Sequence, residues 1–170
     1  WSSDVCSSDL LATLLKAIDV FRAIPDSSFN IDEVSLRKGI EQVVELTGLR
    51  GRWEMLQTSP CVVVDTGHNV GGITYVVEQL KQQSFDRLHI VIGMVSDKDI
   101  NHVLDLLPRD AVYYFTQANV ARALPANEMK LQAERHGLVG NAYTSVLEAV
   151  NTAKKNASNT DFIFIGGSNF

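Results

Sequence analysis

The stretch Cys61-Val62-Val63-Val64-Asp65-Thr66-Gly67-His68-Asn69-Val70-Gly71-Gly72 decides the fold of this sequence. Its first four residues form an apolar run without alternation, which is typical of a strand buried on both faces. The run ends at Asp65, a short polar loop follows, and a helical pattern begins at Val70. Sheets made of such strands are parallel or mixed, and they bind ligands beyond the carboxyl ends of their strands. The stretch therefore predicts an α/β fold, a site at the end of this strand, and full burial of Val63 and Val64.

The rest of the chain alternates between strand and helix patterns. Further strands are expected at residues 88–93, 111–116, 141–143 and 161–165, and helices at residues 70–83, 97–107, 125–137 and 144–157. A short strand with Trp53, Met55 and Gln57 on one side precedes the central strand. The expected buried stripes are Ile73, Val76, Val77 and Leu80 on one helix, and Val146, Leu147 and Val150 on the last helix. This alternation indicates βαβ crossovers, so we predict a three-layer, Rossmann-like α/β sandwich with a mostly parallel sheet.

Two helices are expected before the α/β region. The first spans residues 11–24 and ends at Pro25 and Asp26, and the second spans residues 33–46 after a capping box of Asn30 and Glu33. The first ten residues contain a near-repeat without periodicity, which we interpret as a non-native scar. The expected organisation is a scar at 1–10, a helical junction segment at 11–48 and an α/β domain at 49–170. The chain stops five residues after the last strand pattern, which we interpret as a truncation.

Composition argues against several classes of protein. The net charge of −5 argues against a nucleic-acid partner, because phosphate binding requires a basic face. The sequence contains no apolar run of membrane-spanning length and no signal-peptide pattern. Of the two cysteines, Cys6 and Cys61, the second begins a buried strand and is interpreted as a reduced thiol, which favours a cytoplasmic location. The histidines show no metal-ligand spacing, so no metal site is predicted. We also expect the protein to be a monomer.

Three groups of residues give the sequence a specific resemblance. Gly51-Arg52-Trp53 followed by Asp65-Thr66-Gly67-His68-Asn69 resembles the Gly-Arg…Asp-x-x-His-Asn signature of the folylpolyglutamate and dihydrofolate synthases, which are ATP-dependent ligases of the Mur ligase superfamily. Segments 92–99 and 166–168 resemble two further signatures of that family. The order and spacing correspond to the carboxy-terminal domain and the segment leading into it. The resemblance therefore implies that an amino-terminal ATPase domain is missing.

The resemblance also implies which residues form the site. ATP contacts are expected from Arg52, Asp65, His68 and Asn69, and a possible substrate cleft from Ser96, Asp97, Lys98 and Ser168. Arg52 suits phosphate oxygens, although a surface salt bridge is the alternative. Asp65 either contacts the nucleotide, through ribose hydroxyls or on the phosphate side, or caps its own loop by accepting backbone N–H groups. Asp97 is also the expected cap of the next helix. Leu10 replaces an ATP-contacting Asn of the family, so one nucleotide ligand is absent.

The resemblance implies an activity for the whole enzyme. A folate or pteroate carboxylate is phosphorylated with ATP and Mg²⁺, whose ligands belong to the missing domain, and the amino group of L-glutamate then attacks the acyl phosphate. This chain would supply nucleotide contacts and one wall of the glutamate site, and we expect it to be inactive alone. Two alternatives stay open. One is another Mur-type ligase, such as a peptidoglycan precursor ligase, and the other is a non-catalytic α/β binding module.

Overall fold

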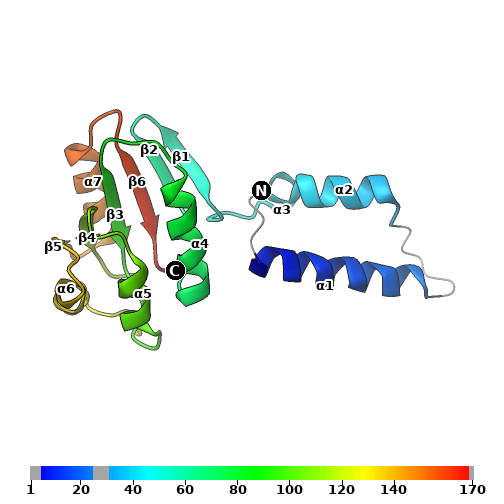
Figure 1. Cartoon of the computed structure of the whole chain (residues 1–170), viewed down its shortest axis with the longest axis horizontal. Coiled ribbons are helices and arrows are strands. Elements are labelled where there is room, and N and C mark those ends of the chain that lie inside the picture. The colour runs from blue at the N-terminus through cyan, green and yellow to red at the C-terminus, as the bar shows by residue number, and fades with distance from the viewer. Residues whose placement is uncertain (1–4, 25–30, 169–170) are drawn as a thin grey trace. The chain divides into compact units, whose positions relative to one another are not determined.

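The structure, a computed structural model, describes residues 5–24 and 31–168. The chain divides into two compact units, residues 1–50 and residues 51–170. The first unit is helical, and the second is a sheet with helices around it (Figure 1). The boundary between the units lies two residues after the expected end of the junction segment.

The first unit contains helices α1 (Val5–Arg22), α2 (Glu33–Glu41) and α3 (Val43–Thr47). The predicted helix at 33–46 is wrong as a single element, because the backbone at Gln42 leaves the helical region with φ −109° and ψ 21°. The cap of α2 is Asp32, whose side chain accepts the N–H of Ser35 at 2.6 Å. The predicted cap Asn30 and the predicted end at Pro25 and Asp26 lie outside the described residues.

The second unit is built on a six-stranded sheet with the order β1-β2-β6-β3-β4-β5. Its strands are β1 (Glu54–Thr58), β2 (Cys61–Val64), β3 (Leu88–Ile92), β4 (Val112–Phe115), β5 (Gly140–Ala142) and β6 (Phe162–Gly166). Strand β1 is antiparallel to β2, and all other neighbours are parallel. The predicted mostly parallel α/β sheet is therefore confirmed, and β6 lies between β2 and β3.

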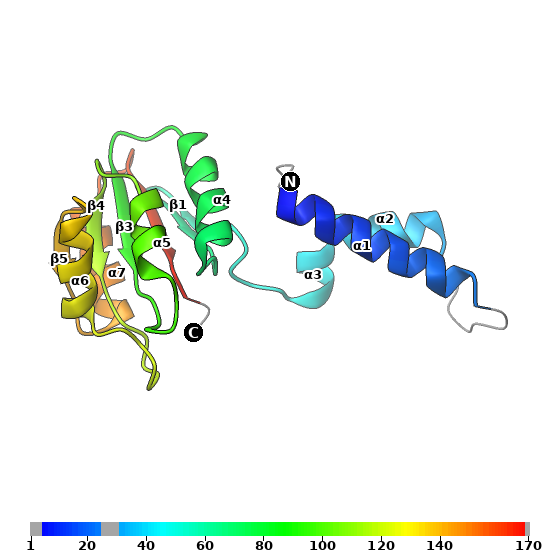
Figure 2. The same ribbon diagram turned by 60° about the horizontal axis from the view of Figure 1, so that its bottom comes forward.

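Helices cover both faces of this sheet, which gives the three layers seen in Figures 1 and 2. The helices are α4 (Val70–Lys81), α5 (Ile100–Leu106), α6 (Ala126–Arg135) and α7 (Val146–Asn156). One face, with Val63, Ile90 and Phe164, packs against α4, α5 and α6. The other face, with Val62 and Val91, packs against α7. Apolar side chains on both faces explain why the strand patterns do not alternate.

The central strand β2 follows the prediction at two of its three valines. Val62 and Val63 point to opposite faces and are almost completely buried. Val64 is only half-buried, so the expectation that it is fully buried is wrong. Cys61 is a half-buried free thiol, and burial raises its pKa. Burial along the strand therefore decreases from Val63 towards Asp65, where the chain enters the candidate site.

Two predicted buried stripes differ from the structure. In β1, a bulge between Met55 and Gln57 interrupts the alternation, and Met55 is 60% exposed rather than aligned with the half-buried Trp53. In α7, Leu147 is 71% exposed, whereas Ala149 and Ala153 are completely buried. Small side chains let α7 approach the sheet closely, and the larger side chains are left outside. The stripe predicted on α4 is confirmed.

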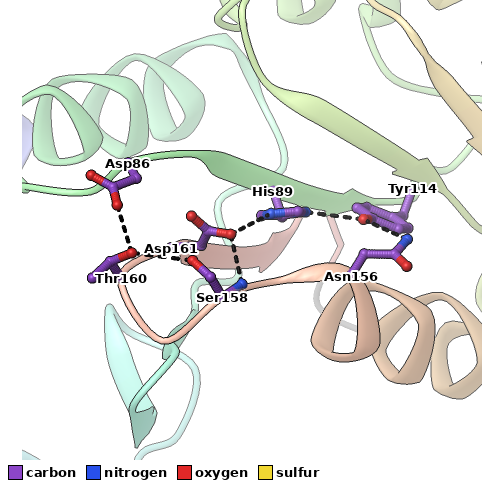
Figure 3. Close-up of polar contacts among 7 residues, drawn as sticks. All are labelled: Asp86, His89, Tyr114, Asn156, Ser158, Thr160 and Asp161. Atoms are coloured by element: carbon purple, nitrogen blue, oxygen red, sulfur yellow. Dashed lines mark hydrogen bonds and ion pairs between the residues drawn. The ribbon is translucent and has the colours of Figure 1, made fainter.

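A polar network lies at the amino ends of the parallel strands (Figure 3). His89 of β3 is 1% exposed and lies between the hydroxyl of Tyr114, 3.0 Å from Nδ1, and the carboxylate of Asp161, 3.3 Å from Nε2. Asn156 of α7 donates to the Tyr114 hydroxyl at 3.2 Å, and the N–H of Ser158 donates to Asp161 at 2.8 Å. The network therefore joins the end of α7 to strands β3, β4 and β6, away from the carboxyl ends of the strands.

Candidate functional site

The direction of the strands gathers the candidate residues at one edge of the sheet. Strands β2, β3 and β6 are parallel, so the segments that follow them, which begin at Asp65, Gly93 and Gly167, emerge at the same edge. Strand β1 is antiparallel, and Glu54 pairs with Val64. The segment just before β1, which contains Arg52, therefore also lies at this edge. All of the predicted site residues belong to these four segments.

Two of the segments are joined directly by hydrogen bonds. The carboxylate of Asp65 accepts the backbone N–H of Trp53 at 2.8 Å and that of Gly67 at 2.7 Å. The N–H of Thr66 donates to the carbonyl of Gly51 at 2.9 Å. The loop before β1 and the loop after β2 are therefore held together on both sides of Arg52. The loop-capping role considered for Asp65 is present, and its nucleotide contact stays a prediction.

The backbone around Arg52 has an unusual conformation. Gly51 and Trp53 both have positive φ angles, 72° and 45°, and Arg52 between them is exposed. A left-handed conformation at a bulky residue such as Trp53 costs about 1–3 kcal/mol. The ring of Trp53 stacks on Phe162 and Phe164 of β6, with both centroid distances at 6.2 Å. Arg52 thus stands on a short loop whose conformation is fixed by the core and by Asp65.

His68 and Asn69 lie in the loop after β2. Nδ1 of His68 is 2.9 Å from the carbonyl of Thr66, and a carbonyl only accepts, so Nδ1 carries the hydrogen. In the neutral ring, Nε2 is then left as an acceptor. The side chain of Asn69 caps α4 by accepting the N–H of Gly72 at 2.8 Å. Asn69 therefore has a structural role, and its amide nitrogen can still donate to a ligand.

The loop after β3 contains the predicted cleft residues. Ser96 and Asp97 are exposed and Lys98 is half-buried. The prediction that Asp97 caps the next helix is wrong, because α5 begins after Asp99, which accepts the N–H of His102. The hydrogen bond from His102 also lowers the pKa of Asp99. Asp97 is free of the capping role and faces a different partner.

That partner is Arg122, which the sequence analysis did not identify. Its guanidinium is 3.2 Å from the carboxylate of Asp97, and its carbonyl accepts the N–H of Ser96 at 3.0 Å. Arg122 lies in the loop after β4, at the same edge of the sheet. The sequence feature that points to Arg122 is its position after the carboxyl end of a predicted strand. Every loop at this edge shares that feature, so it does not single out Arg122. The structure also places Ser168 here, half-buried, after the left-handed Gly167.

Charges of both signs lie at this edge: Arg52, Lys98 and Arg122 are cationic, and Asp65, Asp97 and Asp99 carry carboxylates. Arg52 is exposed, and both carboxylate oxygens of Asp65 already accept backbone N–H groups. Among the residues that the structure describes, no group of three or more His, Cys, Asp or Glu side chains could hold a metal ion. None of the described helices is long and apolar enough to cross a membrane. The arrangement is that of a polar edge with charges of both signs, at which Arg52 is an exposed cation.

Comparisons with known proteins identify the family of this chain. The family described as "Mur ligase, glutamate ligase domain" matches residues 51–169. The dihydrofolate synthase/folylpolyglutamate synthase of Haemophilus influenzae is 28% identical and covers 91% of this chain and 40% of its own length. The enzyme of the same name from Buchnera aphidicola subsp. Acyrthosiphon pisum is 29% identical and covers 84% of this chain and 34% of its own.

Solved structures show the same fold. Escherichia coli FolC in complex with ADP superposes with a TM-score of 0.73 at 27% identity, over 90% of this chain and 35% of that chain. Mycobacterium tuberculosis folylpolyglutamate synthase with ADP and AMPPCP superposes with a TM-score of 0.70 at 25% identity, over 82% of this chain and 33% of that one. The chain spans about a third of the length of these relatives. It belongs to the Mur ligase family, in which residues 51–169 form a glutamate ligase domain of the dihydrofolate synthase/folylpolyglutamate synthase type.

Proposed function

We propose that this domain serves an ATP-dependent carboxylate–amine ligase that adds L-glutamate to a folate or pteroate carboxylate. The observation that carries the proposal is the pair of joined loops that presents Arg52 at the carboxyl edge of the sheet. Solved relatives carry matching ligands: Escherichia coli FolC binds DHPP and ADP, and a bifunctional folylpolyglutamate synthase/dihydrofolate synthase binds Mn, AMPPNP and L-glutamate. We assign the ligands of Mg²⁺ to an amino-terminal ATPase domain, in line with the family resemblance.

The proposed reaction has two steps. A carboxylate oxygen of the folate or pteroate attacks the γ-phosphorus of ATP, which forms an acyl phosphate and releases ADP. The amino nitrogen of glutamate then attacks the acyl carbon through a tetrahedral intermediate. Inorganic phosphate leaves, the nitrogen loses a proton, and an amide bond remains. Both steps place negative charge on oxygen atoms, and fixed donors aimed at such charge lower the barrier.

The residues of this chain divide between two ligands in the proposal. The planar guanidinium of Arg52 suits phosphate oxygens, and the Nε2 lone pair of His68 and the amide nitrogen of Asn69 add polar contacts to the nucleotide. Asp65 accepts hydrogen bonds from ribose hydroxyls in addition to its backbone contacts. Ser96, Asp97, Lys98 and Ser168 line the substrate side, where the ammonium of Lys98 favours a carboxylate. Closure of the two domains brings these groups onto ATP and excludes water.

Steady-state kinetics test this assignment in a fusion of the domain with the amino-terminal part of the Haemophilus influenzae relative. Arg52→Ala should lower kcat about 10²-fold, because a donor to developing charge acts mainly on the transition state. Asp65→Ala should raise KM for ATP, because a ribose contact is the same before and after phosphoryl transfer, and it should also lower kcat, by less than Arg52→Ala, because its carboxylate holds the Trp53 N–H beside Arg52. Lys81→Ala, at the exposed far end of α4, serves as the control. A fusion that forms no amide product, or an Arg52→Ala enzyme with wild-type constants, would refute the proposed function.

A further inference from the structure

Trp53 combines three features that are unusual together. It is a bulky residue with a left-handed backbone, at φ 45°. Its N–H is held by Asp65 at 2.8 Å, and its ring stacks on two core residues, Phe162 and Phe164. An unfavourable backbone conformation persists only where the surroundings determine it, and such conformations concentrate at functional sites. The residue that this conformation directs outward is Arg52.

We propose that Trp53 is a positioning residue, which holds Arg52 in the orientation that binds the phosphates of a nucleotide. The inference rests on the nucleotide role proposed above for Arg52. Trp53 is anchored in the sheet through its ring and in the loop after β2 through its N–H. On the other side of Arg52, the carbonyl of Gly51 accepts the N–H of Thr66. The N–H of Gly51 donates to the carboxylate of Glu54 at 2.8 Å. The backbone of Arg52 is therefore fixed at both ends, and only its side chain is free.

This arrangement reduces the cost of binding. An arginine side chain on a mobile loop loses backbone and side-chain freedom when it binds, whereas one on a fixed loop loses only side-chain freedom. The free energy needed to order such a loop on binding would change the affinity for the nucleotide about three- to tenfold. The proposal therefore predicts that a change at Trp53 weakens nucleotide binding only through Arg52, and that it has no effect once the guanidinium is gone.

Phe85 provides a matched control for the aromatic contact. Its ring also packs on Phe162, at a centroid distance of 5.9 Å, but it lies in the loop before β3, at the opposite edge of the sheet. Both Trp53 and Phe85 are partly buried against the same core. Trp53→Leu and Phe85→Leu therefore both remove an aromatic contact with Phe162, and only the first removes the support of Arg52.

The experiment is a titration of the 170-residue chain with ADP, followed by NMR at the backbone amides and at the Nε–H of Arg52. Arg52→Ala should weaken ADP binding by about tenfold or more, as expected for hydrogen bonds to a charged group. Trp53→Leu should weaken it by about three- to tenfold. The double variant should bind ADP no more weakly than Arg52→Ala alone. Phe85→Leu should bind within about twofold of the unchanged chain, and Trp53→Phe, which keeps a ring, should restore most of the affinity.

A second perturbation covers the case in which Trp53→Leu does not fold. Gly51→Ala places a Cβ 2.7 Å from Cγ2 of Thr66 at a left-handed position, so it distorts the other support of Arg52 without touching the aromatic core. It should weaken ADP binding like Trp53→Leu, and again without effect in the absence of Arg52. Two results would overturn the positioning role and leave the proposed function standing. In the first, Arg52→Ala weakens ADP binding but Trp53→Leu and Gly51→Ala do not. In the second, Trp53→Leu or Gly51→Ala weakens ADP binding further when combined with Arg52→Ala. If Arg52→Ala binds ADP like the unchanged chain, the positioning role also fails, because there is then no phosphate contact for Trp53 to support; the proposed function is decided separately by the kinetics of the fusion.

Discussion

Acidification should destabilise this domain through His89. The hydrogen bonds around the ring, drawn as dashed lines in Figure 3, determine its proton positions. Asn156 donates to the Tyr114 oxygen, so the hydroxyl hydrogen points to Nδ1 of His89, which accepts it. Nε2 then carries the hydrogen and donates to Asp161. The network is therefore complete only with a neutral ring, and protonation of Nδ1 would leave the Tyr114 hydroxyl hydrogen without its acceptor.

The sign of the pH effect follows from the charges that face the ring. Burial lowers the pKa of His89, and Arg87 lowers it further, whereas the hydrogen bond and the charge of Asp161 oppose the change. The hydrogen bond from Ser158 lowers the pKa of Asp161, so Asp161 stays ionised at mildly acidic pH. The folded chain thus favours neutral His89, whereas the unfolded chain binds a proton near the ordinary histidine pKa of 6.5. The stabilisation is present above that pH and is lost as the pH falls.

The linkage between proton binding and folding sets an upper limit on the stability lost on acidification. One differential proton changes the free energy of unfolding by about 1.4 kcal/mol per pH unit, so His89 can remove at most about 2 kcal/mol between pH 7 and pH 5. Urea denaturation of the unchanged chain and of Tyr114→Phe measures this loss at pH 7, 6 and 5. Tyr114→Phe removes the donor to Nδ1, which is one contact that favours the neutral ring, whereas burial, the main cause of the lowered pKa of His89, remains. The variant should be less stable at pH 7, and its stability should depend less on pH.

Tyr143→Phe is the control for this experiment. Tyr143 stacks on Tyr114 with a centroid distance of 5.7 Å, so the variant removes a phenol hydroxyl from the same pair of rings but not from the hydrogen bond to His89. Its pH dependence should match that of the unchanged chain. Equal pH dependence in all three proteins, or an NMR titration of His89 with an ordinary midpoint, would refute the reasoning.

Three further outcomes are expected. Val63→Ala should lower the free energy of unfolding by about 1–3 kcal/mol, and Val64→Ala by less, because Val64 is only half-buried; an equal denaturation midpoint for both would contradict the burial of β2. Gly140→Ala should destabilise by about 2 kcal/mol or more, since its Cβ would lie 2.0 Å from the Tyr113 carbonyl oxygen, whereas Gly71→Ala meets only an ordinary contact at 3.6 Å; urea denaturation compares the two. Calorimetry should find that the chain alone binds ATP with a Kd of about 1 mM or weaker, because most phosphate ligands are assigned to another domain, and a micromolar Kd would contradict this division.

The sequence predicts those parts of the fold in which burial leaves a clear pattern. Strands β2 and β3 are covered on both faces, so their apolar runs are visible without a structure. Helix α4 has its sheet-facing stripe at regular spacing for the same reason. The strand order could not be predicted this way, because the insertion of β6 between β2 and β3 depends on pairing between residues far apart in the sequence.

The failures also have local physical causes. Met55 breaks the expected alternation because a bulge shifts the register of β1. The predicted stripe on α7 contains its largest side chains, such as Leu147, but close packing on the sheet buries Ala149 and Ala153 instead. In the candidate site, the position of Asp65 after a strand was informative, whereas its contact with the Trp53 N–H depends on the antiparallel pairing of β1. The pairing of Arg122 with Asp97 joins two loops and leaves no pattern in either.

The place of β6 between β2 and β3 has a consequence for synthesis on the ribosome. Strands β1 and β2 can pair early, and β3, β4 and β5 can pair later, but β6 pairs with both β2 and β3 and joins the two half-sheets. Strand β3 ends at Ile92 and β6 begins at Phe162, and at about 5–20 residues per second roughly 70 residues take roughly 4–14 s. Throughout that time the apolar strands β2 and β3 each have an open edge, which is prone to aggregation. The domain is therefore expected to complete its folding only after β6 has left the ribosome, and a nascent chain stalled before Phe162 would remain as two separate half-sheets.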